Sequence, residues 1–283
     1  MPSSLSLPHP SSPIGAALEV ALAASDDADA IALASFRRAI EVTAKPDASF
    51  VTAADRAVER AVRERISARF PDHGLVGEEY GEENERSGRR WFIDPIDGTH
   101  NYMRGVPIFA SLLALEVDGQ PLLGVVSAPA LRRRWFSWQD GGAWAVETGP
   151  HGWERSSATP IRVSAVSSLD SASLVYSSLT SMLDCGLAPG FVSLLAGAWR
   201  DRGLGDFFGY MLVAEGAAEA MLEADLKAWD LAAPRAIVQH AGGRLTDLLG
   251  GEDMPARGVL ASNGRLHEAV LEVLGAEAGH RDR

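Results

Sequence analysis

The spacing of apolar positions divides the first seventy residues into two helices. Ala, Leu, Ile and Val recur three and four residues apart over residues 14–44, which predicts the first helix, and residues 45–49 have the composition of a loop. The same spacing over residues 53–70 predicts the second helix. Its apolar face carries Val58, Ala61, Val62 and Ile66, and its charged face carries most of Asp55, Arg56, Glu59 and Arg60.

Short apolar segments in the middle of the chain predict strands. Residues 75–77 end at a pair of glutamates, and residues 91–93 run straight into Asp94. Two further pairs of apolar segments are each joined through an Asp-Gly turn, which is typical of β-hairpins. These pairs are residues 110–117 with 121–127 and residues 135–138 with 143–146.

Helical and strand patterns are mixed beyond residue 160. Residues 173–177 predict a strand, and Gly242-Gly243 predicts a helix stop that is followed by a strand. Mixed elements with hairpins indicate an α+β layered protein rather than a regular βαβ repeat. Helices in this part of the chain are predicted over residues 190–197, 206–222, 230–240 and 266–274.

The length of the chain suits one large domain. Its 283 residues can bury about three quarters of the unfolded surface, so no disulfide or metal staple is needed. Residues 14–283 are expected to form this domain in two halves, with a boundary near residues 148–160. Residues 1–13, rich in Ser and Pro, are expected to be a flexible tail.

Composition excludes several classes of protein. There are 26 basic and 38 acidic side chains, a net charge of −12, which argues against a nucleic-acid partner. Cys185 is the one cysteine, so a disulfide scaffold is excluded and this thiol is expected to be structural. No apolar run approaches the roughly 18 residues of a membrane span, and a signal peptide is not evident. We therefore expect a cytoplasmic protein with no membrane partner.

A cluster of three arginines, Arg132–Arg134, precedes Trp135 and lies near Trp138. Basic and aromatic side chains together can bind nucleic acid. In a chain this acidic we interpret them as the exposed basic end of a hairpin. A place at the rim of an active site or at a dimer contact is the remaining alternative.

The strongest chemical signal is Asp94-Pro95-Ile96-Asp97-Gly98-Thr99. A strand delivers two carboxylates, three residues apart, into a turn where Gly98 lets the backbone approach a ligand. Carboxylates, a carbonyl and a hydroxyl are hard oxygen donors that suit Mg²⁺. The backbone N–H groups after Asp97 could face an anionic oxygen. An Asp-Gly turn without function is the alternative, and the whole hexapeptide argues against it.

Four further acids each allow two interpretations. Glu78 and Glu79 end a short apolar segment, and they belong either to a site or to a solvated acidic loop. Asp55 lies three residues after Thr52, in the position of a capping box, and Asp230 precedes an apolar helix, in the position of an N-cap. A capping carboxylate can also turn one oxygen toward a metal, so these interpretations are compatible.

Phosphate monoester hydrolysis is a reaction that needs such a set of acids. It is among the slowest reactions in water, with enzymatic accelerations up to about 10²¹. Metal ions about 3.5–4 Å apart can clamp the attacking and leaving oxygens. Asp94 is placed to bridge two such ions. With a water near Thr99 as the nucleophile, no Ser or Cys nucleophile is required.

Four segments of the chain, taken in sequence order, resemble the inositol monophosphatase family of Mg²⁺-dependent, lithium-sensitive sugar phosphatases. With Gly242-Gly243 they span most of the chain from about residue 45 onward. The resemblance implies a five-layer αβαβα sandwich that is commonly a homodimer, and a small phosphate monoester as substrate. The four segments are Val51–Asp55, Gly77–Glu79, Asp94–Thr99 and Trp229–Ala233.

The resemblance also implies roles for individual residues. Two or three Mg²⁺ ions would be held: the first by Glu78, Asp94 and the Ile96 carbonyl, the second by Asp94, Asp97 and Asp230, and a weaker third by Glu78 and Asp55 through waters. Thr99, with Asp55 behind it, would orient the attacking water, so Thr99, Asp55 and Glu78 are the catalytic set. Substrate contacts are implied for Asp97, Gly98, Thr99, His100, Arg202, Asp206, Glu223 and Asp230.

Two positions depart from the family pattern. Pro234 stands where Gly is usual; proline is tolerated in the first turn of a helix, so the metal site is expected to remain intact. His100 begins a His-Asn-Tyr segment where Arg or Thr, then Asn and Phe are usual. His100 either contacts the substrate or lies on the rim of the site, and the sequence leaves both alternatives.

Within the family the chain looks most like the histidinol-phosphate phosphatases. Residues 104–115, 124–136 and 205–207 carry this likeness, and Ala128 stands where inositol-specific members have an acidic or polar residue. Asp206 and Glu223 would complement the ammonium and imidazole groups of histidinol phosphate. The expected reaction yields L-histidinol and phosphate, a step of histidine biosynthesis. Inositol-1-phosphate, fructose-1,6-bisphosphate and 3′-phosphoadenosine-5′-phosphate are alternative substrates, and a non-catalytic metal-binding scaffold is a further alternative.

Overall fold

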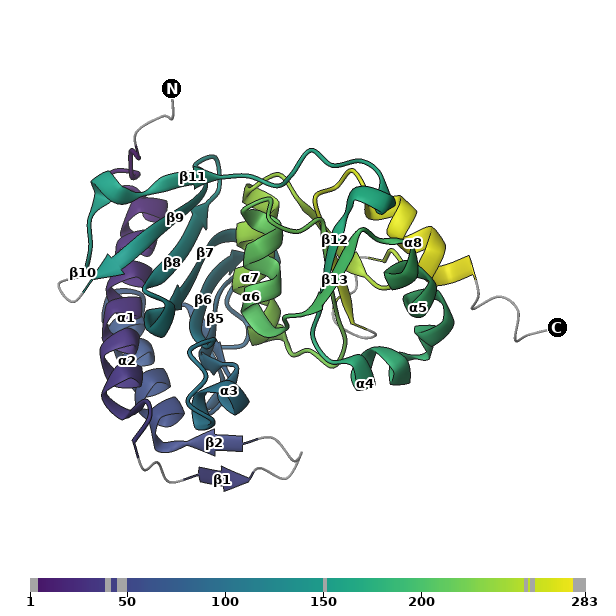
Figure 1. The fold of residues 1–283 in the computed structure, drawn as a ribbon. Helices are drawn as coiled ribbons and strands as arrows, with labels where there is room; N and C mark the ends of the chain where they lie inside the picture. The colour runs from purple at the N-terminus through teal and green to yellow at the C-terminus, as the bar shows by residue number, and fades with distance from the viewer. Residues whose placement is uncertain are drawn as a thin grey trace. The chain divides into compact units, whose positions relative to one another are not determined.

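The chain divides into two compact units in the computed structural model (Figure 1). The first comprises Met1–Pro160 and Trp229–Ile237, and the second comprises Ile161–Ala228 and Val238–Arg283. Helix α7 (Ala228–His240) therefore contributes to both units. The structure describes residues 5–38, 42–44, 50–149, 152–251, 254 and 258–276.

The first unit is built on one mixed sheet. Its nine strands among the described residues follow the order β10-β9-β8-β7-β6-β5-β3-β4, and β11 pairs with β9. Strand β3 runs parallel to β5, and β5 through β9 pair antiparallel in succession. The strands are β3 (Gly74–Gly77), β4 (Gly81–Glu83), β5 (Arg89–Asp97), β6 (Ala110–Val117), β7 (Gln120–Ala128), β8 (Arg133–Trp138), β9 (Gly142–Gly149), β10 (Gly152–Trp153) and β11 (Thr159–Ile161).

Both predicted hairpins are confirmed. Asp118 and Gly119, with φ of 50° and 78°, form the two-residue turn between β6 and β7. Two successive residues with positive φ match the right-handed twist of the strands they join. Asp140 and Gly142 also have positive φ, 65° and 73°, in the turn between β8 and β9.

Helix α1 (Pro13–Ser35) is shorter than predicted. It begins where the Ser12 hydroxyl accepts a hydrogen bond from the Gly15 amide at 3.1 Å. It ends where Phe36 becomes extended and packs its ring against Tyr102 and Phe109, at centroid distances of 5.5 and 4.8 Å. The prediction of helix through residue 44 was therefore wrong. β1 (Val42–Ala44) pairs instead with β2 (Phe50–Thr52), and the predicted loop at 45–49 lies outside the described residues.

The N-terminal residues that are described make contacts with the first unit. Leu5 and Leu7 pack, partly buried, against its hydrophobic core. The Ser12 amide donates to the His9 carbonyl at 2.8 Å, just before α1 begins. Part of the segment predicted as a flexible tail is thus packed on the core.

Helix α2 (Ala53–Arg69) confirms the second predicted helix. Val58, Val62 and Ile66 are buried as expected. Asp55 and Glu59 are also buried, so their assignment to the outer charged face was wrong. Their carboxylates have hydrogen-bond partners inside the unit, and such partners offset much of the cost of burying a charge.

The two faces of the first sheet are covered by different helices. On β7, Leu123 and Val125 belong to the core cluster that includes α1 and α2. Because side chains alternate along a strand, Gly124 points to the opposite face. A Cβ atom there would lie 2.7 Å from the Ala233 carbonyl oxygen, so the absence of a side chain lets α7 lie close to β7.

The second unit has a five-stranded sheet of order β13-β12-β14-β16-β15 among the described residues. Strand β12 runs parallel to β13 and β14, and the other pairs are antiparallel. Leu174, Leu222 and Leu260 belong to the core cluster that includes α5 and α8. The elements are β12 (Ser173–Tyr176), α4 (Leu179–Met182), α5 (Ala188–Gly197), β13 (Arg200–Gly203), α6 (Asp206–Ala214), β14 (Ala220–Glu223), β15 (Arg244–Asp247), β16 (Val259–Ser262) and α8 (His267–Ala276).

One element of the second unit differs from the prediction. The helix expected over residues 206–222 ends at Ala214, and Ala220–Glu223 form the buried strand β14. Gly216 has a φ of 74°, a left-handed conformation that commonly ends helices. Helices layered on mixed sheets in each unit confirm the predicted α+β class.

A helical stretch in the second unit is long and apolar enough to cross a membrane. Leu179–Gly197 has a mean hydropathy of 1.4, so the expectation that no apolar run reaches such a length was wrong. Gly186, with a φ of 87°, interrupts the helical backbone within it. Met182, Leu187, Phe191 and Leu194 of this stretch are buried in the core of the second unit.

Candidate active site

Two parallel strands of the first unit bring Glu78 and Asp94 together. Gly77 of β3 pairs with Ile93 of β5, and the Glu78 amide donates to the Ile93 carbonyl at 3.3 Å. The residues that follow this pair therefore lie beside each other at the same edge. Strand pairing thus brings together two acids that are sixteen positions apart in the sequence.

Asp94 is the centre of an acidic cluster. Its side chain is 2% exposed, and its Oδ1 atom is buried with no hydrogen-bond partner. Burial raises the pKa of Asp94 well above its usual range, and the negative charges of four neighbours raise it further. The structure thus brings Asp94 together with Glu78, Asp97, Asp230 and Asp55.

Asp55 caps helix α2 with one carboxylate oxygen and leaves the other oxygen without a hydrogen-bond partner. Its Oδ2 atom accepts hydrogen bonds from the amide and the hydroxyl of Thr52 at 2.8 and 2.5 Å, which confirms a capping box at the start of α2. Its Oδ1 atom is buried without a partner and is free for a further ligand. Burial is the main cause that raises the pKa of Asp55 to about 6.

Asp230 lies within the first turn of α7, two residues after the helix begins at Ala228. The helix therefore begins two residues earlier than predicted, and the interpretation of Asp230 as an N-cap was wrong. Pro234 consequently lies inside the helix, not in its first turn as expected. Proline has no N–H, so Pro234 cannot donate to the carbonyl four residues earlier, which is that of Asp230.

The turn after β5 shapes the other end of the cluster. The pairing of β5 with β6 is irregular between Asp94 and Asp97, as in a β-bulge. Gly98 has φ 80° and ψ 39°, so a left-handed residue precedes the short helix α3 (Thr99–Met103). The Thr99 hydroxyl donates to the Ile96 carbonyl at 3.0 Å, which joins two groups predicted to serve the site.

The chemistry of the cluster fits a hard cation. All of its donors are oxygens, and two buried carboxylate oxygens, of Asp94 and Asp55, have no hydrogen-bond partner. In the part of the chain that the structure describes, no three Asp, Glu, His or Cys side chains already form a group that could hold a metal ion. A cation would offset the mutual repulsion of the carboxylates when they are ionised.

The predicted contacts to the alcohol half of a substrate lie in the second unit. Asp206 begins α6 with a φ of 55°, and its amide donates to Glu223 Oε1 at 3.3 Å. Glu223 is 5% exposed at the end of β14. Arg202 on the edge strand β13 is exposed and donates to the neighbouring Asp201 carbonyl at 2.6 Å. The structure therefore brings Asp206 and Glu223 together. His100, in the first unit, is exposed.

Within the arginine cluster Arg132 is exposed as expected, whereas Arg134 is buried. Arg134 is 1% exposed, so the prediction of an exposed basic end was wrong for this residue. Its guanidinium pairs with Asp29 and Asp26 of α1, each at 2.8 Å, and its Nε donates to Ser127 at 2.9 Å. It therefore ties β8 to α1.

Two buried charged residues beside the candidate site were not predicted from the sequence to belong to it. Glu59 and Arg63 of α2 are buried and contact the turn after Glu78. A signal was available, because Glu59 follows Asp55 by four residues and such residues share a helix face.

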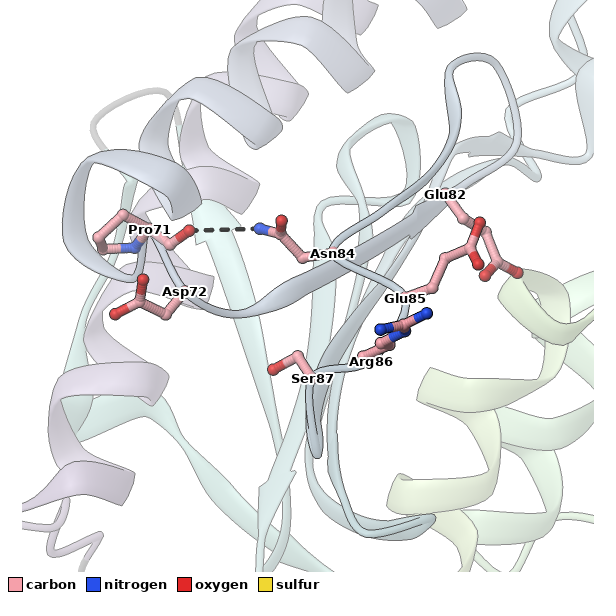
Figure 2. Close-up of a pocket in the computed structure, with 7 residues that line it drawn as sticks. All are labelled: Pro71, Asp72, Glu82, Asn84, Glu85, Arg86 and Ser87. Atoms are coloured by element: carbon pink, nitrogen blue, oxygen red, sulfur yellow. Dashed lines mark hydrogen bonds between the residues drawn. The ribbon is translucent and has the colours of Figure 1, made fainter.

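A separate hollow lies at the opposite ends of β3 and β5 (Figure 2). Pro71 and Asp72 precede β3 and Ser87 precedes β5, whereas the acidic cluster follows both strands. Asn84 Nδ2 donates to the Pro71 carbonyl at 3.3 Å across it. Its volume is about 560 Å³, and its lining mixes acidic residues with Arg86. This hollow is therefore distinct from the candidate site.

Known proteins are similar to this chain in sequence and in fold. A model of the inositol monophosphatase family matches residues 15–277. The histidinol-phosphatase of Mycobacterium tuberculosis is 45% identical over 262 residues, which cover 92% of this chain and 98% of that protein. The histidinol-phosphatase of Streptomyces coelicolor is 43% identical, with coverages of 91% and 96%. The solved structure of the Thermotoga maritima IMPase has a TM-score of 0.80 and 28% identity, with coverages of 94% and 98%.

Proposed function

Because this chain belongs to the inositol monophosphatase family and is a phosphoric monoester hydrolase, we propose that it hydrolyses L-histidinol phosphate to L-histidinol and phosphate in histidine biosynthesis. The observation that carries the substrate is the 45% identity to a histidinol-phosphatase along nearly the whole of both chains. The acidic cluster around Asp94 supports the type of reaction.

The residues of the first unit fit the metal ions that this reaction needs. Two or three Mg²⁺ ions would be held by Glu78, Asp94, Asp97, Asp230 and the Ile96 carbonyl, with Asp55 contributing through water. Bound Mg²⁺ supplies positive charge that offsets the phosphate and lowers the pKa of water. The oxygens of Asp94 and Asp55 that have no hydrogen-bond partner support this assignment, because a buried ionised carboxylate is costly unless a cation pairs with it.

The turn after β5 would position the reacting groups. Gly98, left-handed and without a side chain, leaves the amides that follow it open to approach by a phosphate oxygen. The Thr99 hydroxyl already donates its proton to the Ile96 carbonyl, so its lone pairs are available to accept from a water. Thr99 would thereby orient the nucleophile, with Asp55 behind it.

The acidic pair of the second unit would select the alcohol half of the substrate. Asp206 and Glu223 together can accept hydrogen bonds from an ammonium group and an imidazole. Inositol hydroxyls can also donate to carboxylates, and the similarity to the Thermotoga maritima IMPase favours inositol-1-phosphate as the second candidate. A broad sugar-phosphate phosphatase would have the same cluster of metal ligands.

Phosphate release with Mg²⁺ distinguishes these substrates. We expect kcat/KM for histidinol phosphate to exceed that for inositol-1-phosphate and fructose-1,6-bisphosphate by at least about 100-fold, or roughly 2.7 kcal/mol. Comparable rates on all three would contradict the proposed specificity and identify a broad phosphatase. Absence of release from all three, in protein shown to bind Mg²⁺, would contradict the phosphatase function itself.

Further properties of the family are proposed for this chain. We expect a cytoplasmic homodimer that is inhibited by lithium, since a small monovalent cation can compete for a Mg²⁺ position. Phosphate release measured in 0–50 mM LiCl, with NaCl at matched concentrations as the control, tests the inhibition. Full activity at about 50 mM LiCl would count against inhibition by lithium. Light scattering coupled to gel filtration would measure the oligomeric state.

A further inference from the structure

One stripe of helix α2 carries three charged residues that are all buried. Asp55, Glu59 and Arg63 follow one another at intervals of four, which places them on the same face of the helix. Glu59 is 0% exposed and Arg63 is 7% exposed. Asp55 belongs to the acidic cluster, whereas Glu59 and Arg63 lie one and two turns further along.

Glu59 uses both carboxylate oxygens on the turn that follows Glu78. Its Oε2 atom accepts from the Glu79 amide at 2.7 Å, and its Oε1 atom accepts from the Tyr80 amide at 3.2 Å. Oε1 also accepts from Arg63 Nε at 2.7 Å. Two successive amides of the β3–β4 turn are thus bonded to one buried carboxylate.

Arg63 binds the far side of the same turn. Its Nη2 atom donates to the Gly81 carbonyl at 2.5 Å, and its Nη1 atom donates to Glu83 Oε1 at 2.9 Å. The guanidinium also lies 5.9 Å from the centre of the Tyr80 ring. Together the two side chains of α2 contact the segment from Glu79 to Glu83.

Gly77 shows how closely the pair is packed against the strand. A Cβ atom at this position would lie 2.1 Å from Glu59 Oε1 and 2.8 Å from Arg63 Nη2. On the other side of the same segment, the Glu78 amide is bonded to the Ile93 carbonyl of β5. Glu78 is therefore held between β5 and the α2 pair, with little room to move.

A buried ion pair is by itself a weak source of stability, since apolar residues of similar volume often serve as well. This pair instead makes two hydrogen bonds to the β3–β4 turn and two to the strand β4 that follows it. We propose that Glu59 and Arg63 are positioning residues that hold the β3–β4 turn so that the Glu78 carboxylate stays beside Asp94, ready for a metal ion. The proposal rests on the proposed function only in taking Mg²⁺ as the ion.

The test compares Mg²⁺ binding by full-length variants, measured by titration calorimetry without substrate. In Glu59→Gln the amide NH₂ replaces an acceptor and opposes a backbone N–H. Groups that support metal ligands typically change affinity 10- to 100-fold. We expect the Kd for Mg²⁺ to rise at least 10-fold, and kcat to recover largely at saturating Mg²⁺. Arg63→Lys keeps the charge but loses the forked geometry, and we expect a rise of about threefold or more.

Two controls separate positioning from general destabilisation. Glu64→Gln removes an exposed charge of the same helix that lies outside the network, and Val270→Ala removes core volume in the second unit. Both are expected to keep the wild-type Kd for Mg²⁺, even where Val270→Ala lowers the Tm as much as Glu59→Gln does.

The following outcomes would overturn the positioning role, the proposed function, or both. Folded Glu59→Gln with the wild-type Kd overturns the proposal, and if Glu59→Gln does not fold, an unchanged Kd in Arg63→Lys overturns it. A wild type that binds Mg²⁺ but hydrolyses no phosphomonoester overturns the proposed function while leaving this test valid. A wild type that binds no Mg²⁺ overturns both.

Discussion

Asp94 and Asp55 show how burial changes what a carboxylate can do. Each has one buried oxygen without a hydrogen-bond partner, although an unsatisfied buried acceptor is costly. Burial and four neighbouring charges raise the pKa of Asp94. In the absence of a cation these groups are expected to destabilise the fold, and a bound cation would offset this cost.

Asp94→Asn is therefore expected to have opposite effects on activity and stability. The amide removes a charge from the centre of the metal site, so kcat/KM should fall by about a thousandfold or more, equivalent to roughly 4 kcal/mol. The loss of repulsion should leave the Tm without Mg²⁺ unchanged or higher. Phosphate release and a thermal melt measure the two effects.

Asp72→Asn, in the hollow at the other end of β3, is the matched control and should change neither quantity. A folded Asp94→Asn variant with near-normal turnover would show that the site lies elsewhere.

At the scale of elements, a buried histidine joins α8 to the strands of the second sheet. His267 begins α8, its Nδ1 lies 2.8 Å from Ser262 Oγ of β16, and its Nε2 lies 2.9 Å from Thr246 Oγ1 of β15. Burial, and then the charge of Arg244, lower the pKa of His267 to about 4. The folded state therefore keeps this ring neutral where the unfolded chain, with a pKa near 6.5, is protonated.

This pKa difference makes stability depend on pH in a defined window. Between pH 4 and 6.5 the unfolded state binds one more proton than the folded state. The contribution of His267 to the free energy of unfolding is therefore fully present above pH 6.5 and is lost as the pH falls toward 4. The loss from this residue amounts to about 3 kcal/mol at most. In His267→Gln the free energy of unfolding should be lower at pH 7 but should decline less over this window than in wild type.

Urea denaturation at pH 4.5, 5.5, 6.5 and 7.5 measures this dependence. His9→Gln, near the N-terminus, is the control and should follow the wild-type curve. An identical pH dependence in wild type and His267→Gln would contradict the assignment.

At the scale of the whole molecule, negative charge is both abundant and concentrated. The net charge is −12, and four acids are gathered around Asp94 in the first unit. A cation that binds the folded chain and not the unfolded chain stabilises it by about 2.7 kcal/mol at 100 times its Kd. Mg²⁺ at that concentration should therefore raise the Tm by about 5–10 °C.

A melt with MgCl₂ against NaCl at equal ionic strength measures this shift, and EDTA should reverse it. Asp94→Asn should show a much smaller shift. Equal Tm values in MgCl₂ and NaCl would mean that the acidic cluster does not hold the ion.

The sequence by itself determined the hairpins, the capped helix after Thr52 and the acids of the site. These features depend on turn residues, capping residues and spacing, which act over a few positions. Only the tertiary structure decided that α1 ends at Ser35, that Ala220–Glu223 form a strand, that α7 begins before Asp230, and that Glu59 is buried. In three of these cases the deciding partner is remote in sequence: Phe109 for Phe36, β16 for β14, and the Glu79 amide for Glu59. Contacts of this kind override local propensity, because a buried polar group or ring must find its partner wherever the chain places it.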